Sequence, residues 1–536
     1  MSVLWWRILG AVTGGLLLVA SFPPYDWTWL AIPALALITL SWHGARVRVG
    51  LFLGLLTGIA FFGIHVMWIN VIGDDAWTLL TLFCAAWIAL LAAGVAGTSR
   101  LRWWPLVVPL LWVAEEAARD RVPLGGFPWG RLAFGQTSTT LTPYAALAGA
   151  PGVTFATALA GALLAWGAMS WDHRPPWRQI TALAAVAVVC TAGLLIPLPT
   201  QGQSSDSEPA YVTVAVIQGD VPQAGLDAFG QRAAVLNNHV RVTERLAAQV
   251  AAGKSAQPEL VIWPENASDL DPYANPDARA LIQQAVDAIK APVLVGAVIA
   301  DPADPNRVLN VGIVWGPVNS ADPGPGDSYA KQHPVPFGEW VPWRSVLTRY
   351  IGRFDLVPRD FAPGTRTGVM QLGPARIGNL ICFEVAYDDL GRNAVTGAGT
   401  TGALAGLGGR ILTVQTNNAT YGLTGQPEQQ VAMSQLRAVE HGRAVLVAAT
   451  SGISAVISPD GKLLQQLPEF TPGTIVLRVP LRDALTVADR VGAWPEWVAT
   501  AGGLAAVLVA CLAGLRRRRN PVVGSPSPLP IQERVP

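Results

Sequence analysis

The sequence predicts a multi-span α-helical membrane bundle that carries an α/β domain. Two observations lead to this fold class. Mean hydropathy is +0.37 and only 14% of the 536 residues are charged, which is too apolar for a water-soluble protein of this length. Between residues 199 and 493, by contrast, short apolar runs alternate with amphipathic helical stretches. That alternation is typical of a layered α/β domain with a buried sheet.

Eight apolar segments account for the predicted bundle. Their approximate limits are 8–22, 28–41, 51–72, 77–98, 104–118, 149–171, 180–198 and 494–515. A membrane helix needs about 20 mostly apolar residues, so 28–41 and 104–118 must extend into their flanks. The first segment has a second interpretation as a signal peptide, because Arg7 precedes an apolar core and Ala20-Ser21 resembles a cleavage site. Further apolar segments follow at once, which favours a retained span.

Basic residues in the short loops predict the orientation, since Lys and Arg accumulate on the cytoplasmic side. If the spans alternate, one side receives Arg7, Arg46, Arg48, Arg100, Arg102, Arg174, Arg178 and Arg516 to Arg519. The loops 23–27 and 73–76, on the other side, contain aspartate and no basic residue. Both termini are therefore predicted to be cytoplasmic, and the α/β domain extracytoplasmic, in a cell (inner or plasma) membrane. Arg119, Arg121 and Arg131, in the longer loop after residue 118, are evidence against this orientation.

The α/β domain is predicted to lie between two membrane parts. The expected order is seven spans in 1–198, a polar linker containing Pro and Ser at 199–210, the α/β domain at 211–493, the last span at 494–515 and a basic, Pro-rich cytoplasmic tail at 516–536. Strands are expected at 211–217, 258–263 and 293–299, and helices at 232–252 and 277–289. The net charge of +1 implies no general attraction to nucleic acid.

Cys382 is the most informative residue of the domain. It is the only one of four cysteines outside an apolar membrane-length segment, and it lies at the end of a buried-strand pattern. Without a partner in its own domain, it is either a small core residue or a nucleophile. Glu265 follows the apolar run 260–263, and Lys331 follows the run 311–315. Because functional side chains of a layered α/β fold belong at strand ends, we expect these three residues to meet.

A Glu, a Lys and a Cys together can perform acyl-group chemistry. A thiol with a reference pKa of about 8.5 is mostly protonated at neutral pH, and Glu265 can accept its proton. Lys331 can donate to the oxyanion that forms and can favour the ionised thiol. Each residue also has a simpler explanation: Glu265 as a helix cap, Lys331 as a solvated charge, and Cys382 as core packing. His333 offers a rival Cys-His pair.

Six motifs give the chain a resemblance to a known family. They are QGDVPQ at 218–223, WPE at 263–265, KQHPVPFGEWVP at 331–342, CFE at 382–384, LRAVE at 436–440 and, on the membrane side, GFPW at 126–129. Through these motifs the chain resembles the apolipoprotein N-acyltransferases, the membrane-bound branch of the nitrilase or carbon-nitrogen hydrolase superfamily, over essentially its whole length. The run 331–342 is highly specific, whereas Trp-Pro-Glu also occurs in soluble nitrilases. The resemblance implies a nitrilase-like α-β-β-α domain.

The resemblance also implies roles and substrates. Glu265 would be the general base, Lys331 the oxyanion stabiliser and Cys382 the nucleophile. The supporting residues would be Glu339, Glu384 and Phe383. An acyl chain would pass, in a ping-pong sequence, from a membrane phospholipid through a Cys382 thioester to the α-amine of the diacylglyceryl-modified N-terminal cysteine of an apolipoprotein. No metal or organic cofactor is expected, because no His/Cys cluster has metal-ligand spacing.

The chain departs from many of those relatives in places that concern substrate contacts. It has Gly225-Leu226 where they carry an aromatic residue, Thr420-Tyr421-Gly422 where they often have a Trp-Phe pair, and Phe383 where they have Tyr. Two other function classes remain open. A membrane-anchored amidase or nitrile hydrolase would use the same three residues but gives no reason for so extensive a bundle. A noncatalytic lipoprotein-binding scaffold would tolerate loss of any of the three, yet all are present.

Overall fold

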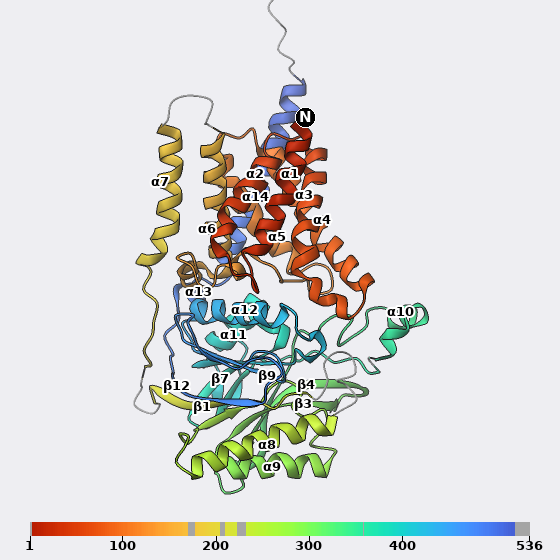
Figure 1. Ribbon diagram of the computed structural model, residues 1–536, viewed down its shortest axis with the longest axis vertical. Helices are drawn as coiled ribbons and strands as arrows, with labels where there is room; N and C mark the ends of the chain where they lie inside the picture. The colour runs from red at the N-terminus through yellow and green to blue at the C-terminus, as the bar shows by residue number, and fades with distance from the viewer. Residues whose placement is uncertain (1–2, 170–176, 204–208, 222–231, 357, 520–536) are drawn as a thin grey trace, which may run out of the picture.

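The computed structural model describes residues 3–169, 177–203, 209–221, 232–356 and 358–519, and it places a helical bundle above a layered α/β domain (Figure 1). Several sequence features of interest lie outside these residues. They are Arg174, the Pro222-Gln223 end of the first motif, Gly225-Leu226, part of the 199–210 linker and the tail after residue 519.

All eight predicted apolar segments form helices. The bundle consists of α1 (Val3–Ala20), α2 (Ala31–Trp42), α3 (Val47–His65), α4 (Asp74–Thr98), α5 (Trp104–Arg119), α6 (Ala145–Ala168), α7 (Trp177–Ala192) and α14 (Trp494–Arg519). Six of them are long and apolar enough to cross a membrane, by length and composition. Helices α2 and α5 are shorter, and α5 ends in the buried charges of Glu115, Glu116 and Arg119. The eight predicted spans therefore correspond to six full-length apolar helices and two shorter ones.

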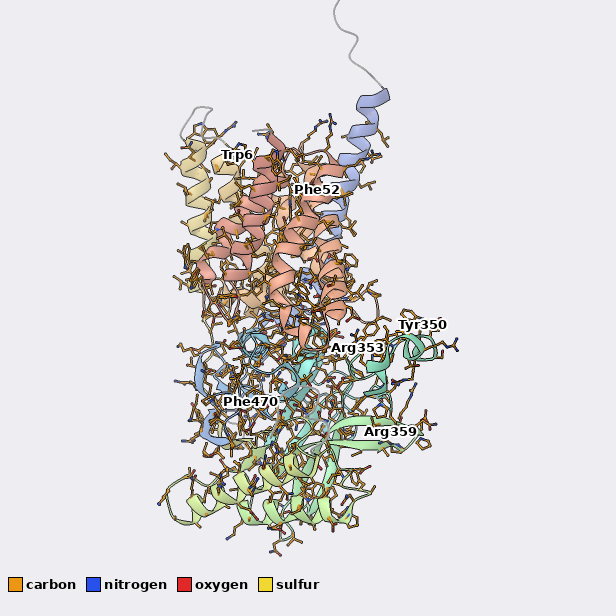
Figure 2. All side chains as sticks on the ribbon, turned by 45° about the vertical axis from the view of Figure 1, so that its right-hand side comes forward. Trp6, Phe52, Tyr350, Arg353, Arg359 and Phe470 are labelled. Carbon is orange, nitrogen blue, oxygen red and sulfur yellow. The ribbon has the colours of Figure 1, made fainter. Side chains whose placement is uncertain are left out.

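Small residues bring the helices of the bundle close together. A Cβ atom at Gly58 of α3 would lie 2.5 Å from the Cα of Ala85 in α4, and one at Gly54 would lie 2.7 Å from the carbonyl oxygen of Ile88. Close backbone approach of this kind is how membrane helices gain contact where lipid offers no hydrophobic driving force. The larger apolar side chains point outward from the bundle, and Trp6 and Phe52 lie exposed on its surface (Figure 2).

The arginine-bearing end of the bundle lies away from the α/β domain. The beginning of α1 and the end of α14 lie at that end in Figure 1. Arg7 closes the neighbouring end of α2 by donating hydrogen bonds to the carbonyl oxygens of Ser41 and His43, at 2.7 and 2.8 Å. At the opposite end, the carbonyl oxygens of Pro23 and His65 accept from Gln429 of the α/β domain. The bundle is thus asymmetric in charge along its axis.

The α/β domain contains two six-stranded sheets. The first sheet has the order β12 (Gly473–Pro480), β1 (Tyr211–Gln218), β2 (Leu260–Ile262), β3 (Val293–Asp301), β4 (Asp304–Gly316) and β5 (Gly324–Ala330). The second has the order β11 (Leu463–Gln466), β10 (Ala455–Ile457), β9 (Val445–Ala449), β8 (Ile411–Thr416), β7 (Ala375–Ile381) and β6 (Val369–Leu372). The central strands β1, β2 and β3 pair in parallel, as do β7, β8 and β9.

Helices cover the outer face of each sheet, which gives the α-β-β-α arrangement that the family resemblance implied. Helices α8 (Arg232–Ala251) and α9 (Pro276–Ile289) cover the first sheet, and α11 (Asp388–Thr396) and α12 (Gln426–His441) cover the second (Figure 1). Two short helices, α10 (Arg344–Tyr350) and α13 (Val487–Val491), complete the domain. Aliphatic side chains such as Val216 and Ile377 fill the space between the sheets. The central strands of both sheets are buried on both faces, which explains their continuous apolar runs.

The order of elements differs from the sequence prediction before Lys331. The strand that immediately precedes this residue is β5, with the sequence GPGDSYA, rather than the apolar run at 311–315. Glycine, proline and aspartate are poor strand formers, so β5 gives no sequence signal. It forms by antiparallel pairing with β4, at the edge of the first sheet.

The bundle and the α/β domain share one hydrophobic core. The apolar cluster that fills the bundle continues without interruption into residues of α11 and α12, such as Leu390 and Leu436. Gln429, at the first turn of α12, adds a polar link. Its side-chain oxygen accepts hydrogen bonds from the indole nitrogens of Trp68 and Trp129, at 3.1 and 2.6 Å. The helical layer on the second sheet is therefore also the base on which the bundle rests.

Candidate active site

Cys382 lies at the point where β7 ends and a short 3-10 helix, η8 (Cys382–Ala386), begins. Its φ of +54° is in the left-handed region, which is rare for a residue with a side chain. Such backbone conformations cost about 1–3 kcal/mol and persist only where the surrounding contacts enforce them. Here the turn presents the half-buried sulfur at the end of the second sheet, facing the bundle side of the domain. A strained turn that exposes a thiol is the geometry expected of a nucleophile.

Glu265 and Lys331 meet beside this turn, as the sequence predicts. The Lys331 Nζ lies 3.2 Å from Oε1 of Glu265 and 2.8 Å from Oε1 of Glu339, and all three side chains are largely buried. Asn310 donates to the same two oxygens, at 2.6 and 3.2 Å. The second oxygen of Glu265 accepts from the backbone N–H of Asn417 at 2.8 Å. The Glu265 carboxylate and the Lys331 ammonium are thus fixed by a hydrogen-bond network that includes the predicted supporting residue Glu339.

Burial and charge set the protonation of this group. Burial raises the pKa of the Cys382 thiol to about 12, and the Glu265 carboxylate adds to the rise while Lys331 opposes it. Burial likewise raises the pKa of Glu265, with Lys331 again acting in the opposite direction. Burial alone would lower the pKa of Lys331, but Glu265 and Glu339 hold it well above its ordinary value. At neutral pH the resting site therefore holds a thiol, a firmly protonated ammonium, and a carboxylate whose proton affinity is increased.

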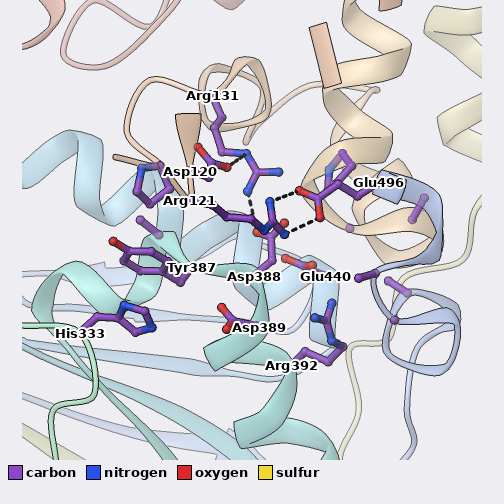
Figure 3. A pocket seen from close by; sticks show the side chains of 18 of the residues that line it. Asp120, Arg121, Arg131, His333, Tyr387, Asp388, Asp389, Arg392, Glu440 and Glu496 are labelled. Carbon is purple, nitrogen blue, oxygen red and sulfur yellow. Dashed lines mark hydrogen bonds and ion pairs between the residues drawn. The ribbon is translucent and has the colours of Figure 1, made fainter. Parts of the chain in front are cut away.

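His333 does not form the rival Cys-His pair. Its ring stacks on Tyr387, with 4.3 Å between centroids and 20° between planes. Burial lowers the pKa of His333, so the ring is neutral at pH 7. Within the described part of the chain, the sulfur of Cys382 has Thr416 and Gln430 as polar partners instead. The His333–Tyr387 stack forms one wall of a cavity next to the site (Figure 3).

Glu384 supports the site through the backbone rather than through Cys382 itself. One carboxylate oxygen accepts from the backbone N–H of Gln332 at 2.6 Å, and the other accepts from that of Ile381 at 2.7 Å. It thereby ties the residue after Lys331 to the residue before Cys382. Burial raises the pKa of Glu384 to about 7, against the lowering effect of these donors. The third predicted supporting residue, Phe383, stacks on Phe127 and Trp129 of the membrane-side GFPW motif.

Arg437 explains the LRAVE motif. Its guanidinium donates to the carbonyl oxygens of Val385 and Ala386, each at 2.8 Å, and so holds the turn that follows Cys382. It also pairs with Asp388 at 2.7 Å and with Glu440. This arginine, near the C-terminal end of α12, is fully buried, so its function is to fix the backbone of η8.

A charged cavity of about 220 Å³ lies between the bundle and the domain (Figure 3). Its lining includes His333 and Tyr387 but not Glu265, Lys331 or Cys382. Arg131 pairs there with Asp388 at 2.7 Å and with Asp120 at 3.4 Å. Arg121 pairs with Glu496 of α14 at 2.6 Å. These ion pairs give the arginines of the loop after residue 118 a structural reason to occur at the domain end of the bundle, contrary to the charge rule for loops.

Sequence reasoning missed four polar residues of the site: Asn310, Thr416, Asn417 and Gln430. Asn310 is inside β4, on an alternating strand where a single polar residue gives no signal. Thr416 and Asn417 end the fully buried strand β8, and polar residues after a buried strand could have been found by the reasoning applied to Cys382. Gln430 is on α12, whose buried face is polar along its first turns and therefore looks solvent-facing in sequence.

Family models match both the membrane part of the chain and the α/β domain. Residues 14–163 match the model of the apolipoprotein N-acyltransferase N-terminal domain, and residues 213–488 match that of the carbon-nitrogen hydrolase family. An apolipoprotein N-acyltransferase of Mycolicibacterium smegmatis is 40% identical over 94% of this chain and 84% of its own length. Its counterpart in Azotobacter vinelandii is 30% identical over 98% of both chains. The chain belongs to the apolipoprotein N-acyltransferase family.

One family model covers most of the helical bundle and the other covers the α/β domain. The N-terminal model ends within α6, and the carbon-nitrogen hydrolase model spans both sheets and their helices. Helices α7 and α14 fall outside both. Among solved structures, an amidase of the nitrilase superfamily from Nesterenkonia is 16% identical, with a TM-score of 0.36 over 52% of this chain and 94% of its own.

Proposed function

We propose that this protein is an N-acyltransferase that moves an acyl chain from a membrane phospholipid to the α-amine of the lipid-modified N-terminal cysteine of a lipoprotein. Cys382 is the nucleophile, Glu265 the general base and Lys331 the oxyanion stabiliser. The observation that carries the proposal is the meeting of these three side chains on the side of the α/β domain that faces the bundle. Family membership supports the substrate class.

The first half-reaction transfers the acyl group to sulfur. Glu265 takes the thiol proton as the sulfur of Cys382 attacks the ester carbonyl of the phospholipid, which is necessary because the thiol is protonated at rest. Lys331 stabilises the oxyanion of the tetrahedral intermediate. The carbon–oxygen ester bond then breaks, and Glu265 returns the proton to the leaving oxygen. The products are a lysophospholipid and a thioester on Cys382.

The second half-reaction uses the same groups in the same order. The unprotonated α-amine of the acceptor attacks the thioester carbonyl, and Lys331 again stabilises the oxyanion. Glu265 accepts a proton from the attacking nitrogen and returns it to the sulfur as the carbon–sulfur bond breaks. The products are an amide and free Cys382. Soluble relatives let water attack at this stage, and we infer that the bundle above the site limits water here.

The proposed location follows from the substrates and the charge pattern. An extracytoplasmic α/β domain, with both termini in the cytoplasm, would bring the site to the outer leaflet, where exported lipoproteins are found. The short loops 23–27 and 73–76, which carry no basic residue, support this orientation, because Pro23 of the first loop contacts Gln429 of the domain. The arginines at this end, Arg121 and Arg131, are ion-paired at the interface.

Mass spectrometry of Cys382 tests the mechanism most directly. After incubation with phospholipid vesicles, the full-length protein should carry one added acyl group on this residue. Cys382→Ala should insert and fold normally but lose the adduct and all acyl transfer, because alanine has no nucleophilic atom to carry the acyl group. Near-normal transfer by that variant would exclude the proposed nucleophile. Steady release of fatty acid without an acceptor peptide would favour a membrane-anchored hydrolase instead.

A further inference from the structure

The sulfur of Cys382 must change its charge during each turnover. It is a thiol at rest, and negative charge develops on it as its proton leaves and again as the thioester breaks, while the burial that favours the thiol opposes that charge. Lys331 is committed to two carboxylates, at 2.8 and 3.2 Å, and is also the donor for the oxyanion. A separate source of hydrogen bonds to the sulfur would therefore help both half-reactions.

Two uncharged side chains contact the sulfur. The Thr416 hydroxyl lies 3.5 Å from the sulfur, and the Gln430 amide nitrogen lies 3.8 Å from it. Both residues are 1% exposed or less. They come from different elements, the end of β8 and the first turns of α12, so the turn of Cys382 is held between the second sheet and its covering helix.

The other hydrogen bonds of Gln430 determine which of its atoms is free to bind the sulfur. The Gln430 side-chain oxygen accepts from Asn418 Nδ2 at 2.7 Å and from the Thr416 hydroxyl at 2.9 Å. In the described part of the chain, the buried Gln430 amide nitrogen has the sulfur as its only hydrogen-bond partner. A buried amide N–H without a better acceptor loses free energy unless the sulfur accepts from it. The contact is therefore a donor aimed at the place where negative charge develops.

We propose that Gln430 and Thr416 are positioning residues that hold the sulfur of Cys382 and stabilise it as a thiolate. At rest, the thiol donates to the Thr416 oxygen while the Thr416 hydroxyl donates to Gln430. When the sulfur loses its proton, rotation of the Thr416 hydroxyl turns it from acceptor into donor. Gln430 is not left unpaired by this rotation, because Asn418 still donates to its oxygen. The inference rests on the proposed role of Cys382 as nucleophile.

The membrane bundle fixes the position of Gln430. The preceding residue, Gln429, is 5% exposed, and its oxygen accepts from the indole nitrogen of Trp129 at 2.6 Å. Trp129 in turn stacks on Phe383, with centroids 5.9 Å apart and 20° between the planes. The contacts thus form a closed ring from Cys382 through Phe383, Trp129, Gln429 and Gln430 back to the sulfur. The bundle therefore takes part in setting the reactivity of the nucleophile.

Alkylation of Cys382 by iodoacetamide measures thiolate reactivity without any lipid. The full-length protein is treated in detergent over a range of pH, and the adduct on Cys382 is quantified by peptide mass spectrometry. Gln430→Met keeps the side-chain length but removes the donor, so the rate at a fixed pH should fall about tenfold and the profile should move about one pH unit upward. Gln430→Glu should be slower still, because it adds a negative charge next to the sulfur.

The other charged groups facing the sulfur are unchanged in these variants. They are Glu265, Lys331 and Glu339, with the Tyr421 phenol nearby. A matched pair at the second position separates hydrogen bonding from packing: Thr416→Val should slow alkylation, whereas Thr416→Ser should keep nearly the wild-type rate. Gln435→Met is the control on the same helix, because Gln435 donates to Gly461 instead and its loss should leave the rate unchanged.

The result can overturn the inference independently of the proposed function. Wild-type or faster alkylation in Gln430→Met would mean that the amide only packs against the site, since simple loosening increases access. Equal slowing in Thr416→Ser and Thr416→Val would have the same meaning for the hydroxyl. Trp129→Phe, which keeps the aromatic stack but removes the bond to Gln429, should slow alkylation less than Gln430→Met. A wild-type alkylation rate in this variant would mean that the Trp129–Gln429 hydrogen bond has no effect on the reactivity of Cys382. Failure of phospholipid to acylate Cys382 would instead refute the function and leave these rates interpretable.

Discussion

Replacing Lys331 by Met should affect the site in three separable ways. The Nζ that lies between Glu265 and Glu339 is 2% exposed, and Met has a similar length without the charge. Loss of the oxyanion donor should slow acylation of Cys382 by about 100- to 1000-fold. The measurement is a single-turnover experiment in which acyl-Cys382 is followed by mass spectrometry after mixing with phospholipid vesicles.

The two remaining effects of Lys331→Met come from the carboxylates that it leaves behind. Glu265 and Glu339 share the Asn310 amide, at 2.6 and 3.2 Å, and without the cation their mutual repulsion should raise the pKa of Glu265 further. A raised pKa leaves a larger fraction of Glu265 protonated at a given pH, so the residual acylation rate should increase with pH. Breaking a buried ion pair should also cost about 3–5 kcal/mol of stability. Lys331→Met/Glu339→Gln should recover much of that stability, measured by thermal unfolding in detergent, without recovering the rate.

His333→Ala is the contrasting variant, because His333 stacks on Tyr387 and has no hydrogen bond to Cys382 among the described residues. Its acylation rate should fall much less than that of Lys331→Met. A near wild-type rate in Lys331→Met, or the reverse order of the two variants, would refute the assignment and indicate a Cys-His mechanism.

Three other predictions concern topology, the second half-reaction and the base of the bundle. A reporter fused after Arg519 should read cytoplasmic and one inserted in the 201–208 linker extracytoplasmic; a cytoplasmic signal from the linker would deny the site access to exported lipoproteins. With phospholipid alone, acyl-Cys382 should persist after one turnover. Addition of a diacylglyceryl peptide should transfer the acyl group to the peptide as an amide, at a rate that rises as the pH approaches the α-amino pKa of about 8. A rate that does not change with pH would contradict attack by the free amine. Burial alone would raise the pKa of Asp388, but Arg131 and Arg437 hold it well below its ordinary value. The ionised Asp388 therefore stabilises the fold at pH values above its unfolded pKa of about 4, and this contribution is lost as the pH falls below that value. Arg437→Met should therefore unfold at lower temperature near neutral pH and show a smaller further loss in acid; an unchanged acid profile would contradict the linkage.

The sequence was most informative where one physical signal dominates. Apolar length predicts the six helices that are long enough to span, because lipid accepts little else. The expectation that 28–41 and 104–118 extend to span length was wrong, since α2 ends at Trp42 and α5 ends at Arg119. Continuous apolar runs predict β1, β2 and β3, because parallel strands are buried on both faces. The three residues of the proposed reaction could be found because two follow such runs and the third, Lys331, belongs to a specific motif.

The remainder depends on contacts between segments far apart in the chain. Strand β5 forms by pairing with β4 and has no propensity of its own. Gln430 is 48 residues from Cys382, and nothing in the composition of α12 indicates that its polar face is buried beneath the bundle. The arginines after residue 118 are counted as loop charges by any rule based on sequence, but they are ion-paired at a domain interface.

The position of α14 in the chain imposes an order on biogenesis. This helix is synthesised after the whole α/β domain, yet it packs against α5, where a Cβ atom at Gly503 would lie 3.1 Å from the carbonyl oxygen of Leu110. Its first turn supplies Glu496, the partner of Arg121 in the loop whose Phe127 stacks on Phe383, next to Cys382. The whole α/β domain is therefore synthesised before the bundle can close around its last member. A chain interrupted before α14 would leave the face of α5 near Leu110 uncovered and would deprive Arg121 of its carboxylate partner.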